Sequence, residues 1–201
     1  MFVVKPTNRK WIDSFRHTIE DGGVVIFPSD SSYGIAVDAT NEDAIQKVFD
    51  LKKRDGKPLS IIVKDIEQAK TYAQFSQDTE DLWARLIPGQ VTLILPKLPS
   101  LPNSLTCNQS TIGIRIPDNE ITRKLSHAID VPYTATSANL SGQPSCYSVD
   151  EVLLQIDESL IDLVINAGTL PPNPASTVID TTVDPPVVLR KGPVALPSFM
   201  T

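Results

Sequence analysis

Cysteine and histidine are scarce in this 201-residue chain, which has two of each. Cys107 and Cys146 stand far apart, which excludes a disulfide-rich framework and the paired spacing of a zinc site. We therefore expect reduced thiols and a cytoplasmic location. His17 and His127 both fall in amphipathic helical patterns, where structural or solvated side chains are expected rather than catalytic ones.

Long apolar runs and an excess of positive charge are also missing. The runs Val24–Phe27 and Val91–Leu95 are far below the roughly 18 residues that a membrane span requires. The start of the chain has no signal-peptide pattern. Lys and Arg number 18 against 24 Asp and Glu, a net charge of -6. The sequence therefore predicts no membrane insertion and no broad surface for nucleic acid.

The common nucleotide and hydrolase motifs are absent as well. The chain contains no G-x-x-x-x-G-K-[ST] loop, no G-x-G-x-x-G turn, no G-x-S-x-G elbow and no H-E-x-x-H helix. If the protein binds a nucleotide, it does so without any of these motifs. The hydrophobic content of 41% and charged content of 21% are those of a globular protein, and the length suits a single domain over residues 1–201.

Periodicity predicts an alternation of short helices and strands. An amphipathic helix is expected over Trp11–Ile19, because apolar residues recur at helical spacing before Gly22 and Gly23. A buried strand follows over Val24–Phe27, then a polar loop over Pro28–Gly34 and a second strand over Ile35–Ala39.

The rest of the chain continues this mixed order. Further helices are expected over 41–49, 65–73, 82–86, 121–129 and 148–156, and further strands over 59–63, 91–95, 111–116, 133–136, 163–165, 177–180 and 187–190. Strands and helices in this order predict an α/β protein of the α+β type. We expect a twisted, mixed and largely antiparallel open sheet with helices packed on it and a concave ligand cleft.

Polar clusters follow several predicted strands, where open sheets place ligand sites. Pro28–Gly34 carries three serines, an aspartate and a tyrosine, and Lys52-Lys53-Arg54 precedes Gly56-Lys57-Pro58. The first cluster is also what an ordinary turn would contain. The second suits a helix C-terminus as well as a phosphate, although Lys52 and Arg54 would point to the same side of an extended chain.

Two later clusters add to this pattern. Strict alternation over Thr111–Pro117 places Thr111, Gly113 and Arg115 on one face, with Gly113 leaving open space beside Arg115. Arg115 needs an anion, either a ligand or an internal carboxylate. The stretch Thr134–Gly142 is small and hydroxyl-rich, which permits close approach of a ligand but also describes a common loop.

Taken in order, these clusters resemble the YrdC-like family of threonylcarbamoyl-AMP synthases. Pro28–Ile35 is similar to the family's P-T-[DE]-T-x-Y-G-L loop, and Lys52–Arg54 to its K-x-R motif. The further matches are Pro88–Thr92, Thr111–Pro117, the intact T-S-A-N-x-S-G loop at Thr136–Gly142, Ser176–Asp180 and Leu189–Gly192. Seven motifs in register make the resemblance specific.

The resemblance implies an enzyme, a nucleotidyltransferase that condenses L-threonine, bicarbonate and ATP with Mg²⁺ into threonylcarbamoyl-AMP and pyrophosphate. A separate threonylcarbamoyl-transferase complex would then modify tRNA, and the net charge predicts weak or no direct tRNA binding by this chain. A YrdC-like paralogue that binds nucleotide or RNA without synthase activity is the alternative, and a structural adaptor of a tRNA-modifying complex is a third.

The resemblance also implies roles for individual residues. Lys52, Arg54, Ser137 and Asn139 would surround the reacting centre and the phosphates. ATP would be bound by Lys52, Arg54, Thr111, Asn139 and Arg190, and threonine by Ser31, Arg115, Ser137 and Ser176, with Arg115 on the carboxylate. No protein-only metal site is implied.

The chain departs from the family pattern in two places. Ser29 and Ser31 replace threonines, and Asp55 stands where proline is usual. The chain resembles the short, single-domain form of the family.

Overall fold

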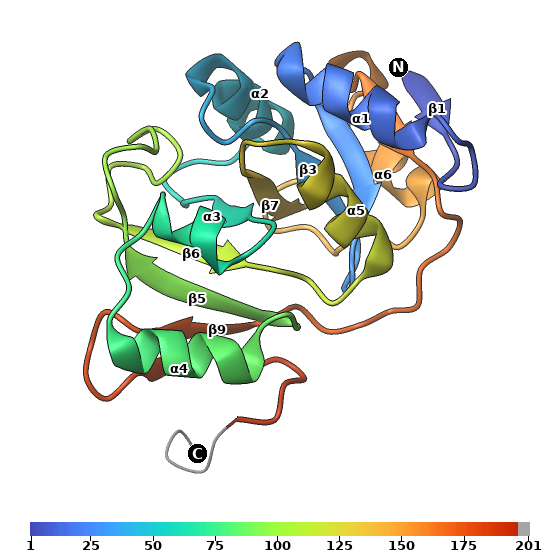
Figure 1. The fold of residues 1–201 in the computed structure, drawn as a ribbon. Helices are drawn as coiled ribbons and strands as arrows, with labels where there is room; N and C mark the ends of the chain where they lie inside the picture. Colours follow the sequence, from blue (N-terminus) through green and yellow to red (C-terminus); the bar gives the residue numbers. More distant parts are fainter. Residues whose placement is uncertain (197–201) are drawn as a thin grey trace.

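A mixed sheet of ten strands organises the part of the chain described by this computed structural model, residues 1–196 (Figure 1). The strands are β1 (Phe2–Val4), β2 (Val25–Pro28), β3 (Tyr33–Ala36), β4 (Ser60–Ile62), β5 (Val91–Pro96), β6 (Thr111–Arg115), β7 (Tyr133–Ser137), β8 (Leu163–Ile165), β9 (Thr177–Asp180) and β10 (Val187–Arg190). Their spatial order is β1-β8-β2-β3-β7-β4-β6-β5-β9-β10. Five neighbouring pairs are antiparallel and four are parallel, so the predicted mixed α/β class is confirmed.

Six α-helices pack on this sheet, and their first residues follow polar caps in most cases. They are α1 (Trp11–Glu20), α2 (Glu42–Lys52), α3 (Ile66–Lys70), α4 (Gln77–Leu86), α5 (Glu120–Ala128) and α6 (Val149–Gln155), with a 3₁₀ turn η1 at Glu158–Leu160. The Asn41 side chain accepts a hydrogen bond from the Ala44 amide, and Ser148 caps α6 in the same way. Such caps satisfy amides that the helix itself leaves unpaired.

The two faces of the sheet are covered differently. One face packs against α2, α3, α4 and α6 in a large apolar cluster that includes Ile35, Ile61 and Ile114. On the other face, α1 and α5 lie side by side over the end of the sheet that holds β8, β2 and β3 (Figure 1). No helix among residues 1–196 is long and apolar enough to cross a membrane.

The fold adds one strand that the sequence does not predict and corrects two expectations. The edge strand β1 was not expected, because three residues that pair with a strand far along the chain leave no local pattern. The predicted polar loop Pro28–Gly34 is a short turn over Ser29–Ser32, since Pro28 already pairs with Tyr33. The strand β3 is Tyr33–Ala36 with both faces buried, not an alternating strand over Ile35–Ala39.

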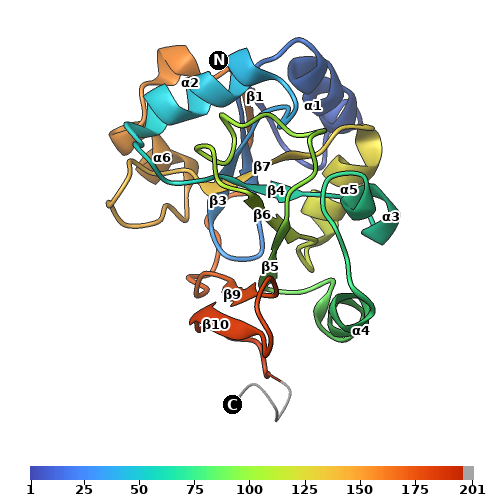
Figure 2. The same cartoon turned by 90° about the vertical axis from the view of Figure 1, so that its left-hand side faces the viewer.

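The lower end of the molecule is formed by α4, β9 and β10, far from α1 and α2 (Figure 2). The expected domain over residues 1–201 extends into residues 197–201, which lie outside the described part of the chain.

Candidate functional site

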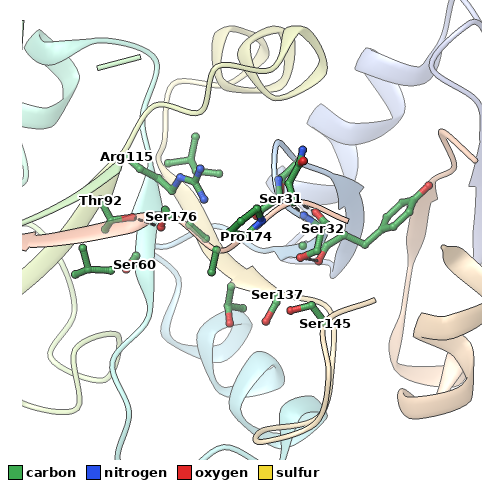
Figure 3. Close-up of a pocket in the computed structure, with 18 of the residues that line it drawn as sticks. Ser31, Ser32, Ser60, Thr92, Arg115, Ser137, Ser145, Pro174 and Ser176 are labelled. Atoms are coloured by element: carbon green, nitrogen blue, oxygen red, sulfur yellow. Dashed lines mark hydrogen bonds between the residues drawn. The ribbon is translucent and has the colours of Figure 1, made fainter. Parts of the chain in front are cut away.

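Helices α1 and α5 cover only part of their face of the sheet. A cavity of about 370 Å³ opens on the uncovered part of that same face. Side chains from several strands line this cavity, because the strand register aligns Thr92 with Val178, Arg115 with Ile62 and Ser137 with Gly34. The turn before β3 and the segment before β9 form the remaining walls. Hydroxyl groups from separate parts of the chain thus surround one space (Figure 3).

Hydroxyl groups and cations dominate the cavity wall. Seven serines, three arginines and no Asp or Glu lie in the described lining, namely Ser29, Ser31, Ser32, Ser60, Ser137, Ser145, Ser176, Arg54, Arg115 and Arg190. Such a wall suits a ligand with negative charge and several polar groups.

Arg115 is fixed by a buried carboxylate. One terminal nitrogen of its guanidinium donates to both Asp30 oxygens at 2.7 Å, and both side chains are almost fully buried. The Nε atom is buried and finds no partner among the described residues. The internal ion pair left open by the sequence therefore exists, and it leaves Arg115 with donor groups beyond those that Asp30 uses.

Arg54 lies just after the end of α2, and its side chain hydrogen-bonds to the loop that follows it. Its Nε donates to the Lys57 carbonyl at 2.8 Å, and a terminal nitrogen donates to the Pro58 carbonyl at 2.7 Å. Burial lowers the pKa of Arg54 from its ordinary value. No carboxylate within 4.0 Å pairs with this cation in the described chain, so an anion in the cavity would meet uncompensated charge.

Arg190, the last residue of β10, lines another side of the cavity. Its Nε donates to the Ser176 carbonyl at 2.9 Å and a terminal nitrogen donates to Ser176 Oγ at 3.0 Å. Ser176 Oγ also lies 3.0 Å from Thr92 Oγ1 on β5. Burial, together with the positive charge of Arg115, lowers the pKa of Arg190. Strands β10 and β5 therefore both hold Ser176 in place.

Lys52 lies beneath the wall rather than in it. The side chain is 1% exposed, and its Nζ donates to the backbone carbonyls of Ser137 and of Asn139, the latter at 2.7 Å. Burial and the nearby Arg54 lower the pKa of Lys52 to about 7. Lys52 ends α2 and Lys53 is left-handed, so the chain is not extended here, and the condition under which Lys52 and Arg54 would point to the same side is not met.

Asn139 lies beside Lys52 in the turn after β7. Its Oδ1 accepts a hydrogen bond from Ser137 Oγ, and its Nδ2 donates to the carbonyls of Leu140 and Gln143 at 2.8 and 2.6 Å. The residue is 6% exposed. Both the oxygen and the nitrogen of the Asn139 side-chain amide are thus hydrogen-bonded to the protein.

The structure brings six of the nine proposed site residues to the cavity wall and leaves three outside it. Arg54, Ser137, Arg190, Ser31, Arg115 and Ser176 line the cavity, whereas Lys52, Asn139 and Thr111 do not. Thr111 stands at the far end of β6, where it pairs with Pro96. Asp55 is exposed in the loop after Arg54 and is not part of the wall.

Sequence reasoning missed several residues that shape the site. The sequence pattern places Asp30 only in a polar loop and Thr92 only in a motif. It gives no signal for Ser60, because a single serine at the start of a strand is ordinary. The open space expected at Gly113 is wrong: a Cβ built there would lie 2.4 Å from Ser60 Oγ, so the Ser60 side chain fills that space.

The mixed sheet with an arginine- and hydroxyl-lined cavity defines a class of ligand-binding α/β proteins, and comparison with known sequences gives the family. Residues 17–192 match the sequence model of the Sua5/YciO/YrdC family, described as "telomere recombination". This chain belongs to that family.

Several relatives are similar over nearly the whole of this chain. The threonylcarbamoyl-AMP synthase of Pyrococcus abyssi is 36% identical over 176 residues, which cover 87% of this chain and 52% of the relative. The protein YciO of Escherichia coli is 30% identical over 195 residues, covering 95% of this chain and 94% of YciO. This chain thus spans about half the length of the P. abyssi protein and nearly all of YciO.

Solved structures give the same result for the fold. P. abyssi Sua5 complexed with L-threonine superposes with a TM-score of 0.88 at 34% identity, covering 95% of this chain and 57% of that chain. The crystal structure of E. coli YciO superposes with a TM-score of 0.83 at 29% identity, covering 95% and 94%.

Proposed function

We propose that this protein is a threonylcarbamoyl-AMP synthase, a nucleotidyltransferase that joins L-threonine, bicarbonate and ATP and releases pyrophosphate. The observation that carries the proposal is the cavity wall, where Arg54 and Arg190 have no carboxylate partner among residues 1–196 and serines surround them. The relative named threonylcarbamoyl-AMP synthase and the related structure complexed with L-threonine support the same assignment.

Each part of the substrates finds a chemical counterpart in the site. Arg54 and Arg190 are suited to the triphosphate, because a planar guanidinium donates to phosphate oxygens in pairs. Arg115 has donors left over for the threonine carboxylate, and Ser31, Ser137 and Ser176 offer hydroxyl groups nearby. Lys52 and Asn139 act as positioning residues under the wall, and Thr111 is assigned to the nucleotide by its place on the same face of β6.

The reaction needs no nucleophilic side chain from the protein. The amine of threonine and bicarbonate give a carbamate, with loss of water. A carbamate oxygen then forms a bond to the α-phosphorus of ATP, and the bond from that phosphorus to the pyrophosphate oxygen breaks. The protein lowers the barrier by holding the reactants together and by placing fixed positive charge around the phosphates.

Magnesium would enter with the nucleotide. No group of three or more His, Cys, Asp or Glu among residues 1–196 is arranged to hold a metal ion, and the wall carries arginines instead of carboxylates. We therefore propose that Mg²⁺ would be bound with ATP and not by a protein-only site, and that it would supply positive charge to the leaving pyrophosphate. The chain's own residues would contact the remaining phosphate oxygens.

The product is a mixed anhydride and must be used by a second protein. We propose a threonylcarbamoyl-transferase complex that passes the group to tRNA in the cytoplasm. The net charge of -6 favours delivery of the small product to that complex over tight tRNA binding by this chain.

The proposal is tested by pyrophosphate release from ATP with Mg²⁺ and bicarbonate, measured without amino acid, with L-threonine and with L-serine. We expect release that depends on both threonine and bicarbonate. Nucleotide binding without stimulation by any amino acid would contradict the proposal and favour the non-catalytic paralogue.

A further inference from the structure

We infer that Gln90, which lies outside the cavity wall, is a positioning residue for threonine binding. Its side chain fixes the peptide bond between Asp30 and Ser31. That peptide in turn places the Asp30 carboxylate, which orients Arg115, and the Ser31 hydroxyl. The inference rests on the proposed function and deepens it, because it adds a residue that acts on threonine binding without touching the ligand.

The backbone carbonyl of Asp30 accepts two hydrogen bonds from side chains far away in the sequence. Gln90 Nε2 donates to it at 2.7 Å, and Asn173 Nδ2 donates to it at 3.0 Å. Only the NH₂ ends of these two amides can face a carbonyl oxygen, because their own oxygens are acceptors. A carbonyl oxygen has two lone pairs, so the two amides together satisfy it fully.

These two bonds come from outside the turn that contains Asp30. Within the turn, Ser29 donates to the Ser32 carbonyl through its amide at 3.1 Å and through its hydroxyl at 2.7 Å. The Ser31 amide reaches Ser29 Oγ only at 3.3 Å. Turns of this length can hold their central peptide in either of two orientations. The orientation of the Asp30–Ser31 peptide therefore depends on the two side-chain amides.

The central peptide of the turn joins two groups that the proposed function assigns to threonine binding. The Asp30 carboxylate accepts both of its 2.7 Å hydrogen bonds from one terminal nitrogen of Arg115, and the Ser31 side chain lines the cavity. The buried Arg115 Nε has no partner among the described residues, so the orientation of this guanidinium decides what it offers to an anion. A rotation of the peptide would displace both groups at once.

The backbone of Gln90 is held by strands on both sides of β5. The Gln90 carbonyl accepts from the Thr177 amide at 2.8 Å, and Val91 pairs with Thr177 in the parallel β5–β9 ladder. The Gly89 amide donates to the carbonyl of Ile116, directly after β6, at 2.9 Å. A donor that projects from such a fixed backbone defines the position of its acceptor more closely than one on a loop.

The test removes the donor with little change in the size of the side chain. Gln90→Met is similar in volume but has no N–H group, whereas Gln90→Lys restores a donor. Gln68→Met is the matched control, because Gln68 Nε2 also donates to a backbone carbonyl, that of Asp130 at 2.8 Å, and lies outside the cavity wall. KM for threonine, KM for ATP and kcat are measured from pyrophosphate release.

Gln90→Met should raise the KM for threonine about fivefold, as expected for one lost hydrogen bond, with the KM for ATP and kcat unchanged. Gln90→Lys should recover most of the wild-type KM, and Gln68→Met should retain it. A merely structural role would not separate the two substrates in this way. An unchanged KM for threonine in Gln90→Met, an equal rise for ATP, or the same rise in Gln68→Met would overturn the inference.

Urea unfolding without ligand tests the shared carbonyl. Either amide alone still satisfies the Asp30 carbonyl, so the double variant Gln90→Met/Asn173→Leu should lose more stability than the sum of its two single variants. Gln68→Met combined with Asn173→Leu should be additive. Additive losses in the Gln90 and Asn173 pair would overturn the role of Gln90 in fixing this peptide.

Pyrophosphate release by the wild type distinguishes failure of the inference from failure of the proposed function. Threonine-dependent release by the wild type, with the same KM for threonine in Gln90→Met, would overturn only the positioning role. Absence of threonine-dependent release by the wild type would overturn the proposed function, and the role of Gln90 in threonine binding would fall with it.

Discussion

At the scale of single residues, the cations of the site differ in the groups that they contact. Asp30 neutralises Arg115 and two carbonyls accept hydrogen bonds from Lys52, whereas Arg54 and Arg190 donate only to neutral groups within the described part of the chain. The sequence identifies all four cations as candidates, but it cannot show which of them has a carboxylate partner and which has only neutral partners. For Arg115 the assignment depends on Asp30, which is 85 residues away in the chain.

Replacement of Arg54 tests the role of a free cation. Arg54→Ala should lower the rate of threonylcarbamoyl-AMP formation on the order of 100-fold, because one preorganised donor to the phosphates is lost. Steady-state kinetics with saturating threonine measure the effect. Lys53→Asn is the control, since it removes a neighbouring exposed charge and asparagine tolerates the left-handed backbone there. Near-normal turnover of Arg54→Ala would remove Arg54 from the mechanism.

The buried Lys52 predicts a pH dependence of stability. Its pKa is about 7 in the folded protein and near 10.5 in the unfolded chain. Below pH 7 both states hold the proton, so the cost of the buried charge is fully present. Between pH 7 and 10.5 the unfolded state holds more protons, and stability should rise with pH by up to about 1.4 kcal/mol per unit.

Urea unfolding at pH 7, 8 and 9 measures this effect in the wild type and in Lys52→Met, which cannot titrate there. The difference in unfolding free energy between the two proteins should grow in favour of the wild type as the pH rises. A difference that stays constant from pH 7 to 9 would contradict the lowered pKa of Lys52.

At the scale of secondary-structure elements, the site is built where short strands end against polar turns. Helices with clear caps and apolar periodicity, such as α1 and α2, could be predicted from the sequence because their signals are local. The position of the turn Ser29–Ser32 could be predicted from the sequence, but its conformation could not. That conformation depends on pairing between β2 and β3 and on the contact of Asp30 with β6. Strand β1 could not be predicted for the same reason.

The ion pair between Asp30 and Arg115 ties the turn after β2 to β6. Asp30→Asn should destabilise the protein by about 3 kcal/mol, because it leaves a buried guanidinium without its counter-charge. The double variant Asp30→Asn/Arg115→Gln should be more stable than Asp30→Asn alone. Urea denaturation of the three proteins measures both effects.

Asp55→Asn is the matched control for Asp30→Asn, because Asp55 is exposed and its removal should change stability by less than about 0.5 kcal/mol. Equal effects of the two single variants would contradict a structural role for the buried pair.

At the scale of the whole molecule, a negatively charged protein concentrates positive charge in one cavity. The net charge is -6, yet the cavity wall holds three arginines and no carboxylate among the described residues. The sequence predicted the mixed sheet and the cleft, because the order of polar clusters matches a known family. It could not show that α1 and α5 cover only part of one face, which is what leaves the cavity open.

The charge balance predicts that tRNA is not held tightly by this chain alone. Gel-shift or filter binding with unmodified tRNA at about 150 mM salt should give a dissociation constant weaker than about 10 µM. Binding below about 1 µM under these conditions would contradict the prediction and would indicate a basic surface that contacts RNA directly.

The most direct test of the synthase assignment is the transfer of labelled carbon from bicarbonate into a nucleotide product. Purified protein is incubated with ¹³C-bicarbonate, ATP, Mg²⁺ and L-threonine, and the mixture is analysed at once by mass spectrometry. The account predicts a labelled threonylcarbamoyl-AMP that is absent without threonine and strongly reduced in Arg54→Ala. Unlabelled AMP alone, or the same products without threonine, would contradict it.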